Sequence, residues 1–216
     1  MRNDFLENPI VLKDIPKECP FDLHLIENNE KQISQICDFL TSDKKVLTVN
    51  GFMGSGKSQI VNFVSGYLNP SALLLHFTCF EMTILDDLLL GFFETFRNYT
   101  LLGKITAPKI KVENFTQKIN SYFNTITSPI LIVIDSFDAL MKENKSAILE
   151  FIKHLTSYPN IKIVIISKAF ENIRLYKCFT LSYSQRCKKM PFYCYNPFPV
   201  RVILADSIYL TKSIHF

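Results

Sequence analysis

The stretch GFMGSGKS, residues 51–58, constrains the fold of this chain more than any other segment. It follows the apolar run KVLTVN (45–50), whose length and β-branched content predict a buried strand. It opens a run with helical character that continues to about Tyr67 and ends at Asn69-Pro70. A glycine-rich turn between a strand and a helix that ends in Lys-Ser fits the phosphate-loop pattern G-x-x-x-x-G-K-[ST].

Each residue type in this turn has a physical reason. Glycines let the backbone curl so that successive N–H groups converge on an anion, and the helix N-terminus adds its positive dipole end. Lys57 can reach the β- and γ-phosphates, and the Ser58 hydroxyl can bind Mg²⁺. The alternative is a glycine turn with a merely solvated lysine. We predict that ATP and Mg²⁺ are the cofactors, with GTP as the alternative nucleotide because no residue in the sequence identifies the base. The predicted nucleotide-binding residues are Gly51, Met53, Gly54, Ser55, Gly56, Lys57, Ser58 and Gln59.

An acidic residue at the end of another apolar run is the candidate metal-side carboxylate. The run PILIVID (129–135) predicts a strand that ends in Asp135, at the edge of the sheet where open α/β sheets bind ligands. Together with Ser58, Asp135 is the predicted metal-binding pair; the alternative is an aspartate that only caps the next turn. Many ATPases carry a second acid directly after the first, but here Ser136 stands there. Asp138 is the nearest acid, and it is either the catalytic residue that orients water or a solvated residue at a helix start.

The run IKIVIIS (161–167) predicts one more strand, and Ser167-Lys168 stands at its end. A hydroxyl there can touch the γ-phosphate or the attacking water, and a cation can sense whether that phosphate is present. We therefore place Ser167 and Lys168 with Asp138 as candidate catalytic residues. The alternative is the ordinary polarity of a strand end.

Strands and helices alternate along the rest of the core. ALLLHFTC (72–79) reads as a strand, and CFTLSYS (178–184) as a further candidate, which gives a mostly parallel sheet of about five strands. Helices are expected over 29–40 with Asn29 as cap, over 83–96 with Thr83 and Asp86 as a capping box, over 112–126 and over 145–155. Alternation at this spacing predicts a three-layer α/β/α fold.

Charge and punctuation divide the chain into three parts: an extended, proline-containing lead-in (1–27), a core (28–176) and a tail (177–216). The tail holds six basic residues and one acidic residue, which gives it a charge of +5. Because the whole chain has a net charge of +4, residues 1–176 carry −1. A body without excess positive charge argues against a nucleic-acid-binding domain. The tail reads either as a frameshifted or truncated end or as a basic contact segment.

Targeting signals and cysteine spacing suggest the compartment. No apolar run approaches the roughly 18 residues that a membrane helix needs, and the first residues lack an apolar signal core. The six cysteines form no CxxC pair and no zinc-ligand spacing. We expect a cytoplasmic protein with reduced thiols and no membrane partner.

With these residues placed, the chain resembles P-loop NTPases of the additional-strand class, which includes AAA+ and STAND ATPases, and most closely a STAND-type ATPase domain. The resemblance covers about residues 8–175 and rests on ENNE (27–30), GFMGSGKS, LIVIDSFDAL and IVIISKAF. Lys168 stands where the family has an arginine, so it offers a point charge in place of a bidentate fork. The family's helical lid and winged helix are not recognisable after the core, so we expect this chain not to complete the switch cycle alone.

The resemblance implies an ATP-binding and ATP-hydrolysing molecular switch that acts on a protein partner or by self-association. Because Ser136 replaces the second acid, slow hydrolysis or binding with little turnover is an alternative. A DNA-linked AAA+ ATPase of the initiator or loader type is another, supported only by the basic tail. A small-molecule phosphotransferase would need an acceptor pocket and a basic lid, for which the sequence offers no candidates.

Overall fold

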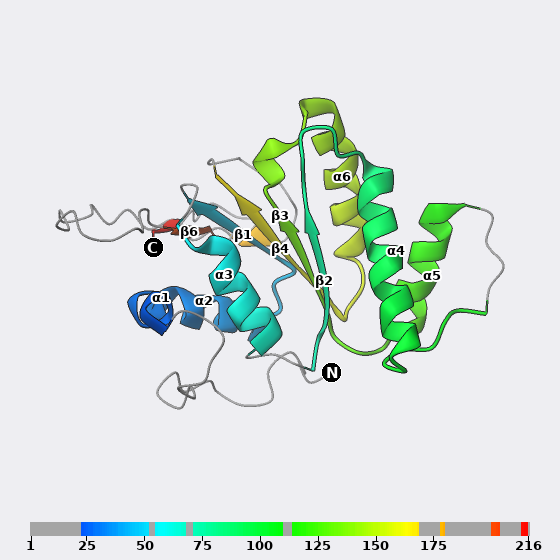
Figure 1. Ribbon diagram of the computed structural model, residues 1–216, viewed down its shortest axis with the longest axis horizontal. Coiled ribbons are helices and arrows are strands. Elements are labelled where there is room, and N and C mark those ends of the chain that lie inside the picture. The colour runs from blue at the N-terminus through cyan, green and yellow to red at the C-terminus, as the bar shows by residue number, and fades with distance from the viewer. Residues whose placement is uncertain are drawn as a thin grey trace.

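The computed structural model describes residues 23–51, 55–67, 71–109 and 114–168, together with short strands at 178–179, 200–203 and 213–215. Four long strands and six α-helices make up the main body (Figure 1). The long strands are β1 (Val46–Gly51), β2 (Leu73–Thr78), β3 (Ile130–Asp135) and β4 (Ile161–Ser167). The helices are α1 (Leu23–Asn28), α2 (Glu30–Thr41), α3 (Lys57–Asn62), α4 (Leu85–Leu101), α5 (Phe115–Thr125) and α6 (Lys142–Leu155).

The four long strands are parallel and stand in the order β2-β3-β4-β1. Strand β4 therefore lies between β1, which leads into the glycine turn, and β3, which ends in Asp135. Three short strands complete the sheet: β5 (Cys178–Phe179) pairs with β1 in parallel, while β6 (Val200–Ile203) and β7 (Ser213–His215) are antiparallel. Parallel strands all end at one edge, so their polar last residues gather there.

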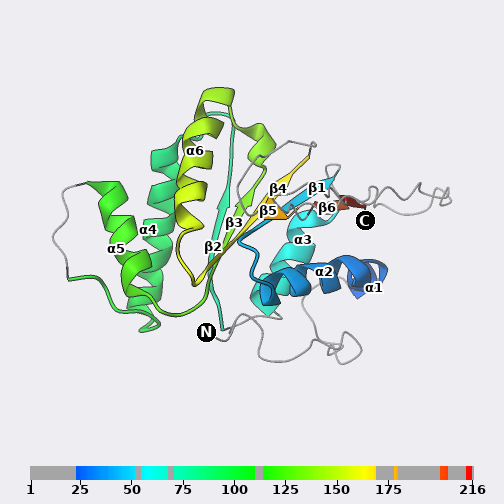
Figure 2. The same ribbon diagram turned by 180° about the vertical axis from the view of Figure 1, so that it is seen from behind.

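Helices cover both faces of the sheet, which gives the predicted three-layer α/β/α arrangement (Figures 1 and 2). One apolar core lies between the sheet and α4, α5 and α6, and it takes Ile130, Ile132 and Ile134 from β3. The other lies between the sheet and α2 and α3, and it takes Leu131 and Val133. The long strands are apolar on both faces because each face is covered, as parallel sheets require.

Helix α4 lies very close to the edge strand β2. A Cβ on Gly91 would stand 2.7 Å from a ring carbon of Phe77, so any larger residue here would require the Phe77 ring or the helix to shift. Further along α4, the Tyr99 hydroxyl donates to the Leu74 carbonyl at 2.9 Å and accepts from the Leu74 N–H at 3.0 Å. This side chain occupies main-chain groups that an edge strand would otherwise offer to another chain.

Several expectations need correction at element ends. Residues 23–28 form helix α1, although the lead-in was predicted to be extended as far as residue 27. Helix α4 is capped one residue later than predicted, because the Asp87 carboxylate accepts from the Ile84 N–H at 2.9 Å. Thr83 is not available for that box, since its hydroxyl accepts from Phe80 N–H at 2.9 Å and closes the preceding turn.

Other elements lie where they were predicted, although α6 begins at Lys142, three residues before the predicted start at 145, and α4 ends at Leu101, five residues after the predicted end at 96. Asn29 directly precedes α2, and its carbonyl accepts from the N–H groups of Gln32 and Ile33. Strand β4 has the predicted bounds, and β5 lies within the predicted 178–184 run. Residues 1–22 and most of the predicted tail lie outside the described residues, so the division of the chain into three parts remains a prediction. No described helix is long and apolar enough to cross a membrane.

Candidate functional site

The glycine turn passes into α3 through a left-handed residue. Gly56 has φ 82° and ψ 5°, a conformation that L side chains rarely adopt, and Lys57 is the first residue of the helix. Gly51 ends β1, and Ser55 is buried beside the turn. Gln59 is exposed on α3. Met53 and Gly54, two of the predicted nucleotide-binding residues, lie outside the described residues.

The ammonium of Lys57 is folded back onto its own loop. Lys57 Nζ donates to the Gly51 carbonyl at 2.8 Å and lies 3.4 Å from Ser55 Oγ, and the side chain is only 8% exposed. Burial lowers the pKa of Lys57, while Asp135 and Asp138 raise it and Lys168 lowers it. Asp135, Asp138 and Lys168 are therefore all close enough to Lys57 to act on its charge.

Ser58 and Asp135 are in direct contact, although Ser58 lies on the helix that follows β1 and Asp135 ends β3, and these two strands are not neighbours in the sheet. Ser58 Oγ donates to Asp135 Oδ2 at 2.5 Å. A hydroxyl and a carboxylate oxygen side by side are the ligand types that Mg²⁺ prefers, so these two residues fit the predicted cation. In the part of the chain that the structure describes, no cluster of three or more His, Cys, Asp or Glu residues is able to hold a metal. Phosphate oxygens would have to complete the coordination.

The backbone after Asp135 turns sharply. Ser136 has φ 56°, and among the described residues it is the one non-glycine residue with a positive φ. Its N–H donates to Asp135 Oδ1 at 2.6 Å, so the turn holds the carboxylate with Oδ2 toward Ser58. A serine in a left-handed conformation costs about 1–2 kcal/mol, and such strain is concentrated at functional sites.

His76 joins this site from strand β2, and the sequence reasoning missed it. Its Nε2 lies 3.9 Å from Asp135 Oδ2, and the two side chains are 28% and 13% exposed. Burial lowers the pKa of His76 and Asp135 raises it, with burial the larger effect, so the ring is neutral near neutral pH. The available signal was a histidine within the otherwise apolar stretch LLLHF, two residues after Leu74 and therefore on the same strand face.

One carboxylate oxygen of Asp138 is engaged in a hydrogen bond. It lies in a short 3₁₀ turn, η3 (Phe137–Ala139), and its Oδ1 accepts from the main-chain N–H of Lys168 at 2.7 Å. The bond joins the turn after β3 to the end of β4. Asp138 is half-buried and Lys168 is exposed.

Ser167 lies on a different side of the sheet from Asp135. It shares the strand face of Ile163 and Ile165, which pack toward α4, α5 and α6, whereas Asp135 follows the face of Val133 toward α3. Ser167 is 1% exposed and pairs in register with Asn50, which is 2% exposed. Of the predicted catalytic residues, Asp138 and Lys168 are thus joined to each other, and Ser167 faces away from the Ser58–Asp135 pair.

The cysteine beside the site is chemically quiet. Cys79 is a buried free thiol, and its main-chain N–H donates to the Asp135 carbonyl at 2.8 Å. Burial, with Asp135 and Asp138 nearby, raises the pKa of Cys79 to about 12. The thiol therefore stays protonated at neutral pH and is a poor nucleophile.

Comparison with known proteins places this geometry among P-loop domains. The profile of the KAP family P-loop domain matches residues 94–169, which span α5, β3, α6 and β4 and the last eight residues of α4. The matched segment is less than half of the chain and includes Asp135 and Lys168 but not the glycine turn. No curated protein sequence matches the chain.

Several solved structures are similar at low identity. Cdc6p from Pyrobaculum aerophilum is 14% identical, with a TM-score of 0.49, and the alignment covers 75% of this chain and 42% of that one. Drosophila ORC bound to AT-rich DNA and Cdc6 is 16% identical, with a TM-score of 0.46 and coverage of 68% and 48%. Domain III of the Thermotoga maritima replication initiation protein DnaA is 14% identical, with a TM-score of 0.36 and coverage of 71% and 63%. This chain spans less than half the length of the first two.

The predicted resemblance to P-loop NTPases with an additional strand is confirmed. The strand order puts β4 between the phosphate-loop strand and the strand of Asp135, and the family profile matches both β3 and β4. The chain therefore has the α/β fold that was expected, with a segment over residues 94–169 that is similar to the KAP family P-loop domain.

Proposed function

We propose that this chain binds ATP together with Mg²⁺ and acts as a nucleotide-dependent switch with slow hydrolysis. The observation that supports this most is the bond between Ser58 Oγ and Asp135 Oδ2 at 2.5 Å, with the buried Lys57 ammonium in the preceding residue. A cation, a hydroxyl and a carboxylate from two separate strand ends converge where a triphosphate and its metal would lie.

Each residue has a distinct part in the proposal. Lys57 exchanges the Gly51 carbonyl for phosphate oxygens, and the α3 N-terminus holds the same anion. Ser58 and Asp135 hold Mg²⁺, which neutralises phosphate charge when it is bound. Ser136 stands where many ATPases have a second acid, and Asp138 is tied to Lys168 through one oxygen. Weak positioning of water explains why we propose slow turnover.

The switch would use the bond between Asp138 and Lys168. Charges at Asp138 and Lys168 already act on Lys57, so a γ-phosphate beside Lys57 would change the balance at the ends of β3 and β4. ATP can shift such an equilibrium only by its differential affinity for two states, with about 5.5 kcal/mol needed for complete reversal. A protein partner or a second copy of the chain would then read the change.

Nucleotide binding to Lys57→Ala tests the proposal. Hydrogen bonds to charged groups contribute about 1.5–3 kcal/mol each, so we expect the ATP affinity to fall at least tenfold. Calorimetric titration measures it, and circular dichroism checks that the fold is kept. Lys153→Ala, an exposed lysine on α6, is the matched control and should bind like wild type.

Two outcomes separate this proposal from its rivals. Equal ATP affinity in wild type and Lys57→Ala would overturn the nucleotide site itself. Equal stabilisation by ATP and ADP without phosphate release would keep the site but replace the switch with a structural nucleotide-binding role.

A further inference from the structure

We propose that His76 is a ligand of the divalent cation that accompanies the nucleotide, so that this site accepts Mn²⁺ better than a site made of oxygen ligands alone. The inference rests on the proposed nucleotide function and adds a residue from a third strand to its cation site. The arrangement of β2 and β3, the spacing at Asp135 Oδ2 and the chemistry of imidazole support it in turn.

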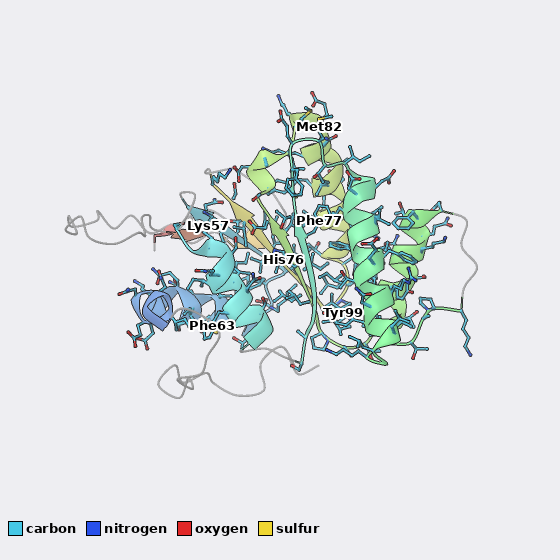
Figure 3. All side chains as sticks on the ribbon, in the orientation of Figure 1. Lys57, Phe63, His76, Phe77, Met82 and Tyr99 are labelled. Atoms are coloured by element: carbon cyan, nitrogen blue, oxygen red, sulfur yellow. The ribbon has the colours of Figure 1, made fainter. Side chains whose placement is uncertain are left out.

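The register of β2 against β3 puts His76 on the correct face. Thr78 pairs with Asp135 and His76 with Val133, so His76 lies two pairs below the strand ends. Leu74 and Val133 pack into the core beneath α2 and α3, and the period of two places His76 and Asp135 on that same face. Figure 3 shows His76 on the part of β2 toward α3, while Phe77 lies toward α4.

The separation between His76 and Asp135 is within the reach of two metal bonds. Asp135 Oδ2 is engaged by Ser58 Oγ at 2.5 Å on one side, while His76 Nε2 stands 3.9 Å away on another. A separation of 3.9 Å is too long for a hydrogen bond. Metal bonds to nitrogen and oxygen ligands are about 2.0–2.2 Å, so two of them reach across at most about 4.4 Å. A single cation can therefore bridge the two atoms.

The chemistry of the ligands decides which cation gains. Mg²⁺ demands oxygen ligands and near-octahedral geometry, whereas an imidazole nitrogen suits transition-metal ions. A site with one hydroxyl, one carboxylate, one imidazole and phosphate oxygens still accepts Mg²⁺ but rewards Mn²⁺. The described residues provide no metal cluster of their own, so the nucleotide must be present for the cation to bind.

Electron paramagnetic resonance of Mn²⁺ with a non-hydrolysable ATP analogue tests the ligand directly. Wild type should show electron spin echo modulation from a coordinated ¹⁴N, and protein labelled with [¹⁵N]histidine should show the ¹⁵N pattern instead. His76→Gln should lose the nitrogen signal. His154→Gln should keep it, because His154 lies on α6, where its ring packs against Tyr158. Modulation that persists in His76→Gln, or that is absent in wild type, would overturn the assignment.

Cation preference gives an independent measurement. We expect His76→Gln to weaken the Mn²⁺-dependent affinity for the analogue about tenfold or more and the Mg²⁺-dependent affinity less than twofold. An equal loss with both cations would mean that His76 only supports Asp135, and it would overturn the inference. Binding of the analogue to wild type with Mg²⁺ separates the two proposals. Failure to bind there removes the nucleotide site, whereas normal binding with the same Mn²⁺ to Mg²⁺ affinity ratio in wild type and His76→Gln removes only the role of His76.

Discussion

The carboxylate of Asp138 accepts a hydrogen bond from the main-chain N–H of Lys168 at 2.7 Å, and this bond ties the turn after β3 to the end of β4. The two residues are thirty positions apart in the chain, yet both act on the charge of Lys57. The link therefore gives the ends of two strands one common position relative to the phosphate loop.

The first prediction concerns this link. Asp138→Asn keeps an acceptor oxygen, so we expect its rate of ATP hydrolysis to stay within about threefold of wild type. Asp138→Ala loses the hydrogen bond and should lower that rate about tenfold, since a hydrogen bond to a charged group contributes about 1.5–3 kcal/mol. Phosphate release under saturating ATP measures both. If Asp138→Asn is as slow as Asp138→Ala, the carboxylate charge itself orients water and Asp138 is the catalytic residue.

The second prediction concerns the positive φ of Ser136. A β-branched residue is strongly disfavoured at φ 56°, so Ser136→Val should lower the free energy of unfolding by about 1–2 kcal/mol. Ser136→Gly should leave it within about 1 kcal/mol of wild type, because relief of strain is offset by greater freedom in the unfolded chain. Urea denaturation compares the pair. Equal stability of the two variants would show that the turn relaxes at no cost.

The third prediction concerns a lysine buried at the opposite edge of the sheet. Lys162 Nζ donates to the carbonyls of Phe39, Ser42 and Lys44 at 2.8, 2.6 and 2.9 Å and so binds the end of α2 to β4. Burial, assisted by the charge of Lys45, lowers the pKa of Lys162 to about 7. The unfolded lysine keeps a pKa of about 10.4, so between these values the unfolded chain binds more protons.

This difference fixes the sign of the pH dependence. Because of Lys162, the free energy of unfolding should increase as pH rises from about 7 toward 10. Lys162→Met cannot titrate, so wild type should gain stability relative to this variant from pH 7 to pH 9, with the exposed Lys153→Met as control. Parallel curves for wild type and Lys162→Met would contradict the lowered pKa.

The fourth prediction concerns the protected edge of β2. Tyr99→Phe removes the hydroxyl that serves both the N–H and the carbonyl of Leu74, and leaving such groups without partners costs about 1–3 kcal/mol. We expect a loss of stability of that size and faster hydrogen exchange at the Leu74 amide. An unchanged exchange rate would mean that water replaces the hydroxyl without cost.

The sequence predicted the parts of the site that depend on local pattern. Gly56, Lys57 and Ser58 lie at the start of α3 because a strand, a glycine turn and a helix follow one another in the chain. Asp135 could be placed at a strand end for the same reason, and its contact with Ser58 follows once the strands are parallel.

What the sequence did not reveal depends on strand faces and neighbours. Ser167 ends its strand as predicted. Side chains alternate along the strand, so Ser167 lies on the face that packs toward α6, and the register of β4 with β1 decides that face. His76 was hidden because one histidine within an apolar strand carries no motif, and its proximity to Asp135 arises from the pairing of β2 with β3. The capping of α4 was shifted by one residue because Thr83 was already used by the turn before it.

The hydrogen bond from Lys57 to the carbonyl of Gly51 means that this carbonyl oxygen competes with any bound anion for the Lys57 ammonium. An incoming phosphate group does not meet a bare charge; it exchanges one oxygen for another, and only the difference between the two acceptors contributes to affinity. Anions with a single weak oxygen would therefore leave the lysine where it is, and selectivity for polyphosphates would begin before any base or sugar is recognised.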